Sequence, residues 1–330
     1  MGIKIIGTGS YAPEKVLTNH DLEKMVDTSD EWIRTRTGIE KRHIAADNQS
    51  ASDLAFEACK NAMEMAETSP EEIDLVIVAT VSPDYPFPST ACVLQKKLNI
   101  KQGAMCFDMQ AACSGFIYAI GIANSLIKAH SSIKKALVIG VEKISALTDW
   151  QDRNTCVLFG DGAGAVILEE RSDSNDFGGI VGTKLSADGR FADILQVPAG
   201  GSAMPITNEV MEQRLQYIRM EGQEVFKQAV TAMVGACKDV MEEAGVSSEE
   251  IRWLIPHQAN KRIISAVGKR LNMTEKNVYI NVHKYGNTSA ASIGIALDEI
   301  VRKGLIKRGE YILVTAFGAG LTWGATLLKW

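Results

Sequence analysis

Short apolar runs alternate along this chain with amphipathic stretches of helical length. Residues 74–79, 136–141 and 311–316 are almost wholly apolar, which is typical of strands buried on both faces of a sheet. Residues 58–73 and 236–251 each begin with the apolar spacing of an amphipathic helix and end in a polar turn before a strand. The pattern predicts an α/β protein in which helices cover sheets.

Residues 104–129 form an unusually apolar segment. The segment opens as a short apolar run, turns, and continues from Cys113 as a long helical pattern. Between residues 115 and 126 the pattern is apolar on nearly every face, so the helix must be buried on all sides or lie in a membrane. We interpret the run as too short and too interrupted to span a bilayer. We therefore expect a helix at the centre of a soluble domain, with Cys113 in its first turn.

The chain contains an internal duplication. Residues 58–73 and 236–251 align without a gap and are identical at most positions. Residues 136–141 match residues 311–316 more weakly, and residues 289–300 repeat the small and apolar character of the Cys113 helix. Two copies of one α/β unit predict a five-layered αβαβα sandwich, with one apolar helix of each copy at the centre.

The duplication also predicts where the chain divides. We expect an N-terminal half over residues 1–172 and a C-terminal half over residues 173–330, joined near the polar stretch 173–179. Loops rich in Pro and Gly at residues 83–88 and 198–205 interrupt the pattern, and we expect them to carry specificity or subunit contacts.

Composition narrows the class of protein. The chain has 330 residues and a net charge of −5, which argues against bulk affinity for nucleic acid. The six cysteines show no CxxC pairing, so we expect neither a disulfide framework nor a zinc site. The first residues lack the pattern of a signal peptide, and we expect a reducing, cytoplasmic location.

Three polar or reactive side chains stand where the duplication brings them together. Cys113 lies at a helix start, where unpaired N–H groups and the helix dipole stabilise a thiolate and lower the thiol pKa. His257 follows a strand end, and Asn287 lies just before the second central helix. Each residue alone is more often structural, but their convergence favours catalysis.

Two glycine-containing stretches are candidates for backbone binding sites. Residues 7–12 resemble a dinucleotide fingerprint, but Pro13 and Glu14 stand where the phosphate-binding helix should continue, so we reject it. Residues 317–321 follow the last long strand, and a backbone N–H from this turn could form an oxyanion hole with the N–H of Cys113.

Four motifs in this order closely resemble the thiolase-fold condensing enzymes, and within them the β-ketoacyl-[acyl-carrier-protein] synthase III family. They are ACSGF at 112–116, PHQAN at 256–260, GNTSAAS at 286–292 and the segment 317–324. The resemblance covers the whole chain. It places the family's catalytic triad on Cys113, His257 and Asn287, and the His-Asn pair distinguishes this family from elongating synthases, which use two histidines.

The resemblance implies an initiating condensation of type II fatty acid synthesis. Cys113 would take an acyl primer from acyl-CoA, and malonyl-carrier protein would then lose CO2 and attack the acyl-enzyme. His257 and Asn287 would donate hydrogen bonds to the enolate. The N–H groups of Cys113 and Ala319 would form the oxyanion hole, although the family more often has Gly at the second position. No metal or cofactor is implied.

The resemblance also implies binding residues and partners. The partners would be acyl-CoA, an acyl carrier protein and a second copy of the chain, with no nucleic acid and no membrane. Gln223, near the CoA tunnel, is a departure, since the family often has Asn there. The implied residues are Thr28, Trp32, Arg36, Arg153 and Asn260 for CoA and its pantetheine arm, Phe87 and Phe226 for the acyl pocket, and Lys227, Arg262, Lys269 and Arg270 for the carrier protein.

Three alternatives stay open at this point. One is a relative of the same fold that condenses onto a non-carrier acceptor or makes secondary metabolites. The others are an NAD-dependent oxidoreductase that uses residues 7–12 and a non-catalytic thioester-binding protein. The acyl primer is also open, because acetyl, propionyl and branched chains differ by one or two methylene groups, worth only about 1–3 kcal/mol in an apolar pocket.

Overall fold

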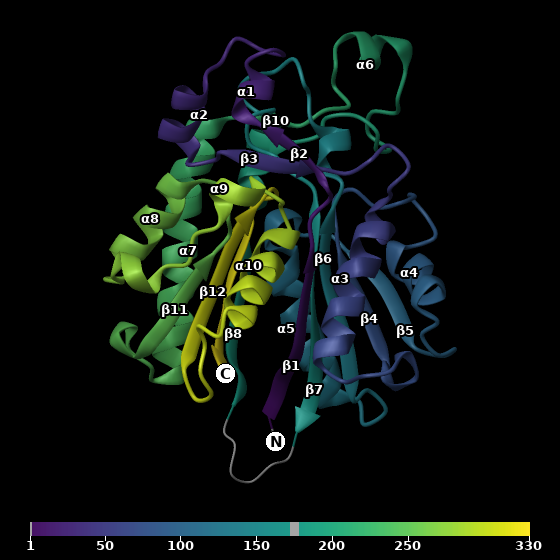
Figure 1. Ribbon diagram of the computed structural model, residues 1–330, viewed down its shortest axis with the longest axis vertical. Helices are drawn as coiled ribbons and strands as arrows, with labels where there is room; N and C mark the ends of the chain where they lie inside the picture. Colours follow the sequence, from purple (N-terminus) through teal and green to yellow (C-terminus); the bar gives the residue numbers. More distant parts are fainter. Residues whose placement is uncertain (1, 172–177) are drawn as a thin grey trace.

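The computed structural model describes residues 2–171 and 178–330, which form two sheets with helices between and outside them (Figure 1). The first sheet has the order β1-β7-β6-β4-β5 and the second the order β11-β12-β13-β8. The strands of the first sheet are β1 (Gly2–Tyr11), β4 (Leu75–Ala79), β5 (Met105–Met109), β6 (Lys135–Glu142) and β7 (Gly162–Arg171). Those of the second are β8 (Gly179–Ala187), β11 (Ile251–Pro256), β12 (Tyr311–Gly318) and β13 (Thr322–Lys329).

Helices complete the five layers, and the predicted layer order is confirmed. Helices α3 (Ala51–Met65) and α4 (Thr90–Leu98) cover the outer face of the first sheet. Helices α7 (Gly222–Ala244) and α8 (Lys261–Arg270) cover the outer face of the second. Helices α5 (Gly115–Ala129) and α10 (Ala291–Arg302) pack between the two sheets (Figure 1).

The two sheets repeat one topology. In the first, β4 is parallel to β6, and β6, β7 and β1 follow antiparallel; in the second, β11 is parallel to β12, and β12, β13 and β8 follow antiparallel. The place of β5 is taken in the second sheet by an isolated parallel bridge between Leu254 and Val278. The repeated polar turns are the short helices η1 (Pro70–Glu72) and η5 (Ser248–Glu250), each with a Ser–Glu capping box.

The predicted junction at 173–179 lies mostly outside the described residues, because residues 172–177 are not described. Residue 171 ends a strand of the first sheet and residue 179 begins a strand of the second. The division of the chain into halves at residues 172 and 173 stays a prediction.

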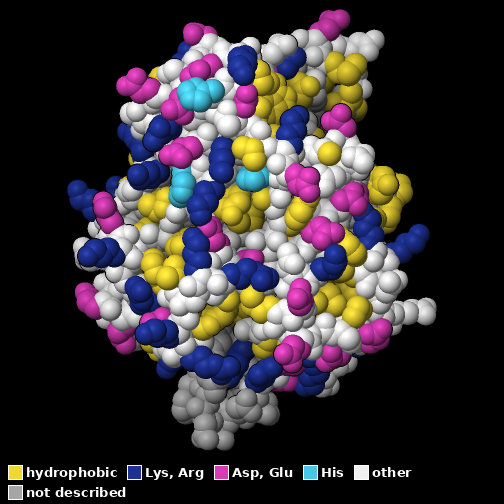
Figure 2. All heavy atoms as spheres, viewed as in Figure 1, with side chains coloured by type: hydrophobic (Ala, Val, Ile, Leu, Met, Phe, Trp, Pro, Cys, Tyr) yellow, Lys and Arg dark blue, Asp and Glu magenta, His cyan; other side chains and the backbone are white. Residues whose placement is uncertain are grey.

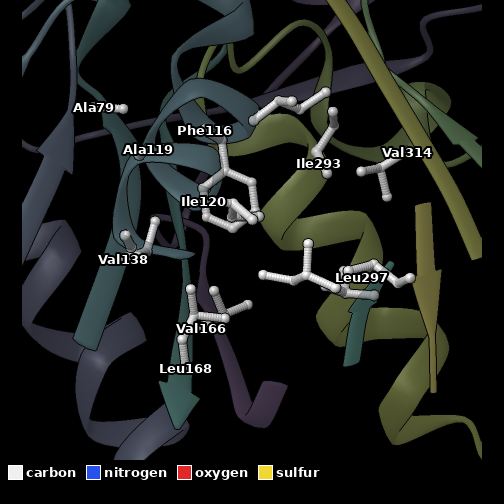
Figure 3. Close-up of a cluster of buried hydrophobic side chains, with 14 of the residues drawn as sticks. Ala79, Phe116, Ala119, Ile120, Val138, Val166, Leu168, Ile293, Leu297 and Val314 are labelled. Atoms are coloured by element: carbon white, nitrogen blue, oxygen red, sulfur yellow. The ribbon is translucent and has the colours of Figure 1, made fainter. Parts of the chain in front are cut away.

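The core between the sheets is apolar. Figure 3 shows Phe116 and Ile120 of α5 facing Ile293 and Leu297 of α10, with side chains from both sheets on either side. All of these side chains are almost completely buried. This packing explains why both central helices are rich in apolar and small residues.

The sequence argument about a membrane needs a correction. The window Ala112–Ala129 is 18 residues long with a mean hydropathy of 1.3, so length and composition alone do allow it to cross a bilayer. Half of that window is buried inside the fold, which accounts for its apolarity. The helix is also less enclosed than expected, because Tyr118 and Ile122 are only half-buried.

The glycine motif at residues 7–12 lies almost wholly within strand β1, paired with β7, and not in a loop. A Cβ atom at Gly9 would lie 2.1 Å from the backbone oxygen of Ala58 in α3. Close packing between strand and helix therefore explains this glycine, and the dinucleotide reading is rejected on structural grounds as well.

A group of smaller elements covers one end of the sandwich, at the top of Figure 1. It contains two small sheets and three helices, and α9 (Val282–Tyr285) lies against β3. The elements are β2 (Lys15–Thr18), α1 (Asn19–Leu22), α2 (Asp30–Thr37), β3 (Lys41–Ile44), β9 (Leu195–Gln196), α6 (Asn208–Glu212) and β10 (Arg219–Met220).

Candidate active site

A cavity of about 1780 Å³ opens between this group of elements and the ends of the two central helices. Cys113, His257 and Asn287 all line it, although they lie far apart in the sequence. They come from the start of α5, the end of β11 and the segment before α10. The structure therefore brings the three candidates into one cavity, and their chemical roles stay predictions.

Cys113 lies in a short 3-10 turn, η2 (Ala112–Ser114), that leads into α5. Ala112 has a φ of 46°, a left-handed conformation that is costly for a residue with a side chain and is typical of functional sites. A Cβ atom at Gly318 would lie 2.6 Å from the backbone nitrogen of Cys113. The turn containing Ala319 thus packs directly against the cysteine backbone, and both Cys113 and Ala319 line the cavity.

The expected lowering of the Cys113 pKa is wrong for this structure. Burial among protein atoms raises the pKa of the thiol to about 12, and the Glu142 carboxylate adds to the increase. The Ser289 hydroxyl lowers this pKa, but by less than burial raises it. Desolvation opposes the charged form of a thiol.

His257 is held as a neutral imidazole. Its side chain is 4% exposed, and burial lowers its pKa to about 3. Nδ1 lies 2.6 Å from the Ser292 hydroxyl oxygen, which also accepts the backbone N–H of Gln258. The Ser292 hydroxyl can donate to Nδ1 or accept from it; when it donates, the ring proton lies on Nε2. A neutral ring with an Nε2–H group can donate a hydrogen bond without carrying charge.

Asn287 is oriented by its own backbone surroundings. Its side-chain oxygen accepts the N–H of Ser289 at 2.9 Å, which assigns the other end of the amide as the donor. Its backbone bonds Leu158 and Gly160, so the segment before α10 is fixed against the preceding loop. Asn287 is 7% exposed. With the Nε2–H tautomer of His257, it would give the cavity two neutral hydrogen-bond donors.

Of the five residues expected to bind CoA, Trp32, Arg36 and Asn260 line the cavity, whereas Thr28 and Arg153 do not. Two guanidinium groups lie close to the Trp32 ring, that of Arg36 at 5.0 Å and that of Arg153 at 4.7 Å from its centre. The Thr28 hydroxyl oxygen is buried without a hydrogen-bond partner among the described residues. The Asn260 side chain caps α8 through the N–H of Arg262 and donates to the Arg36 carbonyl. Asn260 thus joins α2 to α8 at this edge.

The two residues expected in the acyl pocket are placed differently. Phe226 of α7 lines the cavity, and its ring lies 6.0 Å from the Arg262 guanidinium. Phe87 does not line it, and 86% of its surface is exposed. Within a single chain, therefore, Phe226 lines the cavity and Phe87 does not.

The four basic residues expected to contact a carrier protein are all exposed on α7 and α8. Arg262 also lines the cavity, whereas Lys269 and Arg270 lie in the last turn of α8. Figure 2 shows Lys and Arg side chains, with some acidic ones between them, along the edge where α8 lies.

Sequence reasoning missed the residues that support the three candidates. Ser289 and Ser292 stand inside the quoted motif at 286–292, but only the fold shows which groups they contact. Glu142 has a signal in the sequence, an acidic residue at the end of the apolar strand β6. In the part of the chain that the structure describes, no group of three or more His, Cys, Asp or Glu side chains could hold a metal ion.

Comparisons with known proteins identify the family. Two family models match, 3-oxoacyl-[acyl-carrier-protein] synthase III over residues 107–189 and the C-terminal part of the same family over residues 241–330. A beta-ketoacyl-[acyl-carrier-protein] synthase III from Caldanaerobacter subterraneus is 56% identical over 99% of this chain and 97% of its own length.

Comparison with solved structures identifies the same family. The 3-oxoacyl-[acyl-carrier-protein] synthase III from Aquifex aeolicus is 52% identical, covers both chains completely and gives a TM-score of 0.91. A priming β-ketosynthase of the R1128 polyketide pathway is 33% identical over 99% of this chain and 96% of its own, with a TM-score of 0.89. The chain thus has the predicted thiolase-like fold and belongs to the β-ketoacyl-[acyl-carrier-protein] synthase III family, the acyltransferases that carry out the initiating condensation of fatty acid synthesis.

Proposed function

We propose that this enzyme transfers an acyl primer from acyl-CoA to Cys113 and then condenses it with malonyl-[acyl-carrier-protein]. The observation that carries the proposal is the convergence of one thiol, one neutral imidazole and one carboxamide in a single large cavity. The products would be 3-oxoacyl-[acyl-carrier-protein], CoA and CO2. Membership of the family supports the reaction, and the geometry supports the assignment of residues to steps.

In the first half-reaction, the Cys113 sulfur attacks the thioester carbonyl of acyl-CoA and CoA leaves. The N–H groups of Cys113 and Ala319 would bind the oxyanion of the tetrahedral intermediate. The close packing of Gly318 on the Cys113 backbone supports this pair of donors. Because the donors belong to the backbone, Ala in place of Gly at residue 319 leaves the N–H group available.

In the second half-reaction, decarboxylation of the malonyl group places negative charge on its thioester oxygen. The Nε2–H of His257 and the amide N–H of Asn287 would bond that oxygen, each contributing roughly 3 kcal/mol to stabilising the transition state. Both groups are neutral, so neither repels the enolate and neither loses a proton. The enolate carbon then attacks the acyl-Cys113 thioester.

Substrate binding follows the placement of the remaining residues. Trp32 with Arg36 and Arg153 beside it suits an adenine base next to phosphates, since a flat ring and two guanidinium groups can stack and pair with them. We infer that Thr28 and Asn260 contribute to the same channel and that Phe226 borders the acyl chain. Exposed Phe87 would enter the cavity of a second copy in a homodimer.

The remaining assignments also follow from the family and the sequence. We propose that the enzyme works in the cytoplasm without a cofactor, bound to neither membrane nor nucleic acid. The basic residues of α7 and α8 beside the cavity would contact an acyl carrier protein.

The decisive experiment uses labelled acetyl-CoA. The enzyme is incubated with the label and digested, and the modified peptide is identified by mass. We expect label on Cys113, none in Cys113→Ala, and product formation only when malonyl-[acyl-carrier-protein] is added. Label on Cys113→Ala would overturn the assignment of the nucleophile, and equal use of malonyl-CoA would favour a non-carrier acceptor.

A further inference from the structure

Two hydroxyl groups join the turn that carries Cys113 to the turn that carries Ala319. Ser114, the residue after the nucleophile, is completely buried. Its Oγ atom lies 2.7 Å from the Oγ1 atom of Thr322, the first residue of β13. Two hydroxyl oxygens at this distance share a proton, because this is the usual length of an O–H···O hydrogen bond. We call this pair of side chains the hydroxyl bridge.

The hydroxyl bridge also contacts the backbone of both turns. The carbonyl oxygen of Ala111 lies 2.7 Å from Ser114 Oγ and 2.9 Å from Thr322 Oγ1. The carbonyl oxygen of Ala319 lies 3.1 Å from Thr322 Oγ1. Each hydroxyl group has one proton, so when one proton joins the two hydroxyl groups the other bonds one of these carbonyl oxygens. Every such arrangement ties the start of β13 to the turn of the nucleophile.

The backbone of the Cys113 turn is strained, and the bridge contacts it next to the strained residue. Ala112 has a φ of 46°, a conformation that a residue with a side chain rarely adopts. The carbonyl oxygen of the preceding residue, Ala111, accepts the backbone N–H of Ser114 at 3.1 Å in addition to a hydroxyl proton. These bonds hold the turn in the conformation that sets the direction of the Cys113 N–H group.

Two N–H groups at this contact have no backbone partner. In the part of the chain that the structure describes, no backbone carbonyl accepts a hydrogen bond from the N–H of Cys113 or from that of Ala319. Both residues line the cavity. The two turns touch at Gly318, where a Cβ atom would lie 2.6 Å from the Cys113 nitrogen. Gly318 thus lets the turns approach, and the hydroxyl bridge fastens them together.

We propose that the hydroxyl bridge of Ser114 and Thr322 sets the spacing between the N–H groups of Cys113 and Ala319. This inference rests on the proposed function, in which these N–H groups bind the oxyanion. As the sulfur bonds the thioester carbon, negative charge moves to the carbonyl oxygen, and it returns when the CoA thiolate leaves. Neither Ser114 nor Thr322 lines the cavity, so both act as positioning residues.

The spacing matters because an oxyanion is stabilised only by donors at hydrogen-bond distance from it, about 2.7–3.1 Å. Loss of the hydroxyl bridge keeps both N–H groups in the chain but allows the two turns to shift apart. A misplacement of about 1 Å can lower a rate by about a hundredfold. The loss should therefore appear in reactions that form an oxyanion at this point and in no others.

The test compares two reactions of the Cys113 sulfur at pH 7.5. Acyl transfer from acetyl-CoA, followed by rapid quenching and mass measurement of the modified peptide, places charge on a carbonyl oxygen. Alkylation by iodoacetamide displaces iodide from a saturated carbon and forms no oxyanion. Both reactions need the thiolate, so the ratio of their rates does not depend on the pKa of the thiol. A change in this ratio therefore reports on the oxyanion.

Thr322→Val keeps the shape of the side chain but lacks the hydroxyl group. We expect it to lower the rate of acyl transfer about tenfold to a hundredfold, while alkylation changes by less than about twofold. Ser114→Ala removes the other hydroxyl group and should lower the ratio in the same way, which decides the question if Thr322→Val fails to fold. Thr322→Ser keeps a hydroxyl group and should return the ratio close to that of the natural enzyme.

Thr326→Val is the matched control. Thr326 lies four residues further along β13, on the same face of the strand, and its Oγ1 atom lies 3.2 Å from Oγ1 of Thr183, away from the Cys113 turn. The same substitution there should leave the ratio unchanged.

A natural ratio in Thr322→Val or in Ser114→Ala would overturn the proposal, whether both rates fall together or neither does. A low ratio in Thr322→Ser or in Thr326→Val would also overturn it. Absence of acyl-Cys113 in the natural enzyme after incubation with acetyl-CoA is a different result, because it refutes the proposed function and the role of the hydroxyl bridge with it.

Discussion

Single hydrogen bonds decide which end of each polar side chain faces the cavity. The N–H of Ser289 occupies the Asn287 side-chain oxygen, so Asn287 can only donate toward the cavity. The Ser292 hydroxyl lies 2.6 Å from Nδ1 of His257, and by donating to it would leave the ring proton on Nε2. Both donors would then be set before substrate binds, which avoids reorganisation during the reaction.

The first prediction concerns Asn287→Asp. The substitution keeps the shape of the side chain, replaces the donor by an acceptor and adds negative charge near the developing enolate. We expect malonyl decarboxylation to fall about 10²–10³-fold, the size measured for loss of one such donor. Formation of acyl-Cys113 should persist. Release of CO2 and covalent acylation are measured separately, and an equal loss in both would contradict the division of roles.

The second prediction concerns stability and pH. Burial lowers the pKa of His257 from 6.5 to about 3, so below pH 6.5 the unfolded chain binds a proton that the folded chain does not. His257 therefore destabilises the fold progressively as the pH falls from about 6.5 toward 3. Between pH 7 and pH 5 the natural enzyme should lose about 2 kcal/mol more unfolding free energy than His257→Gln, at 1.36 kcal/mol per pH unit below 6.5.

Urea unfolding of both proteins at the two pH values measures this difference. Comparing the natural enzyme with the variant removes the contributions of other titrating groups, which both proteins share. A difference that stays constant with pH would show that His257 titrates normally.

At the scale of helices and strands, close packing of backbone against backbone fixes the position of the central helices. Gly164 of β7 meets Gly294 of α10, and a Cβ atom on either would lie within 3 Å of the backbone of the other. The backbone atoms at this contact cannot move aside as the end of a flexible side chain can. The pair brings α10 against the first sheet, and α10 in turn carries Ser292, which orients His257 of the second sheet.

The third prediction tests this contact. Gly294→Ala should lower the unfolding free energy by about 1–3 kcal/mol, the usual cost of overpacking a core. Gly235 of α7 is the matched control, because a Cβ atom there meets nothing within 4 Å. Gly235→Ala should instead stabilise by about 0.5–1 kcal/mol through helix propensity. Denaturant unfolding compares the two, and equal effects of the same sign would contradict the argument.

The fourth prediction concerns helix α2, which presents Trp32 and Arg36 to the cavity. Arg36→Ala should raise the KM for acyl-CoA roughly twofold to thirtyfold, the effect of losing about 0.5–2 kcal/mol of stacking with a cation. The KM for an acyl-pantetheine without the nucleotide should not change. Steady-state rates with both substrates measure this. Arg34→Ala is the control, since Arg34 on the same helix pairs with Asp30 and Glu40 instead.

How far the sequence predicts this molecule depends on the range of the interactions. Apolar runs and the repeated segments were enough for the layers, because burial of strands and helices follows local patterns. The capping boxes at Ser69 and Ser247 are local too, which is why the repeat is so clear there. In the second sheet, the counterpart of β5 is only a single bridge between Leu254 and Val278. The sequence does not predict this, because the length of such a strand depends on its pairing with β11.

The candidate site shows the same difference between local patterns and contacts that form only in the folded chain. Motifs indicated Cys113, His257 and Asn287, but the thiol pKa was predicted in the wrong direction, because desolvation depends on atoms that surround Cys113 only in the folded chain. Glu142 was missed for a related reason. It contacts Ser289, which lies 147 residues away in the sequence, and no local pattern links the two.

At the scale of the whole molecule, the uneven placement of charge gives the last prediction. The chain has a net charge of −5, yet Lys227, Arg262, Lys269 and Arg270 are all exposed on α7 and α8, and Arg262 lines the cavity. If an acidic carrier protein approaches over α8, the double variant Arg262→Glu and Lys269→Glu should lower kcat/KM for malonyl-[acyl-carrier-protein] more than tenfold at low salt. The loss should shrink as salt rises, because screening weakens steering between charged surfaces. The rate with malonyl-pantetheine should stay within twofold, since this substrate lacks the surface of the carrier protein.

Lys96→Glu is the control: it makes the same change of sign on α4, which covers the other sheet at the opposite side of Figure 1. A similar loss in Lys96→Glu would mean that overall charge, and not the α8 surface, governs the encounter.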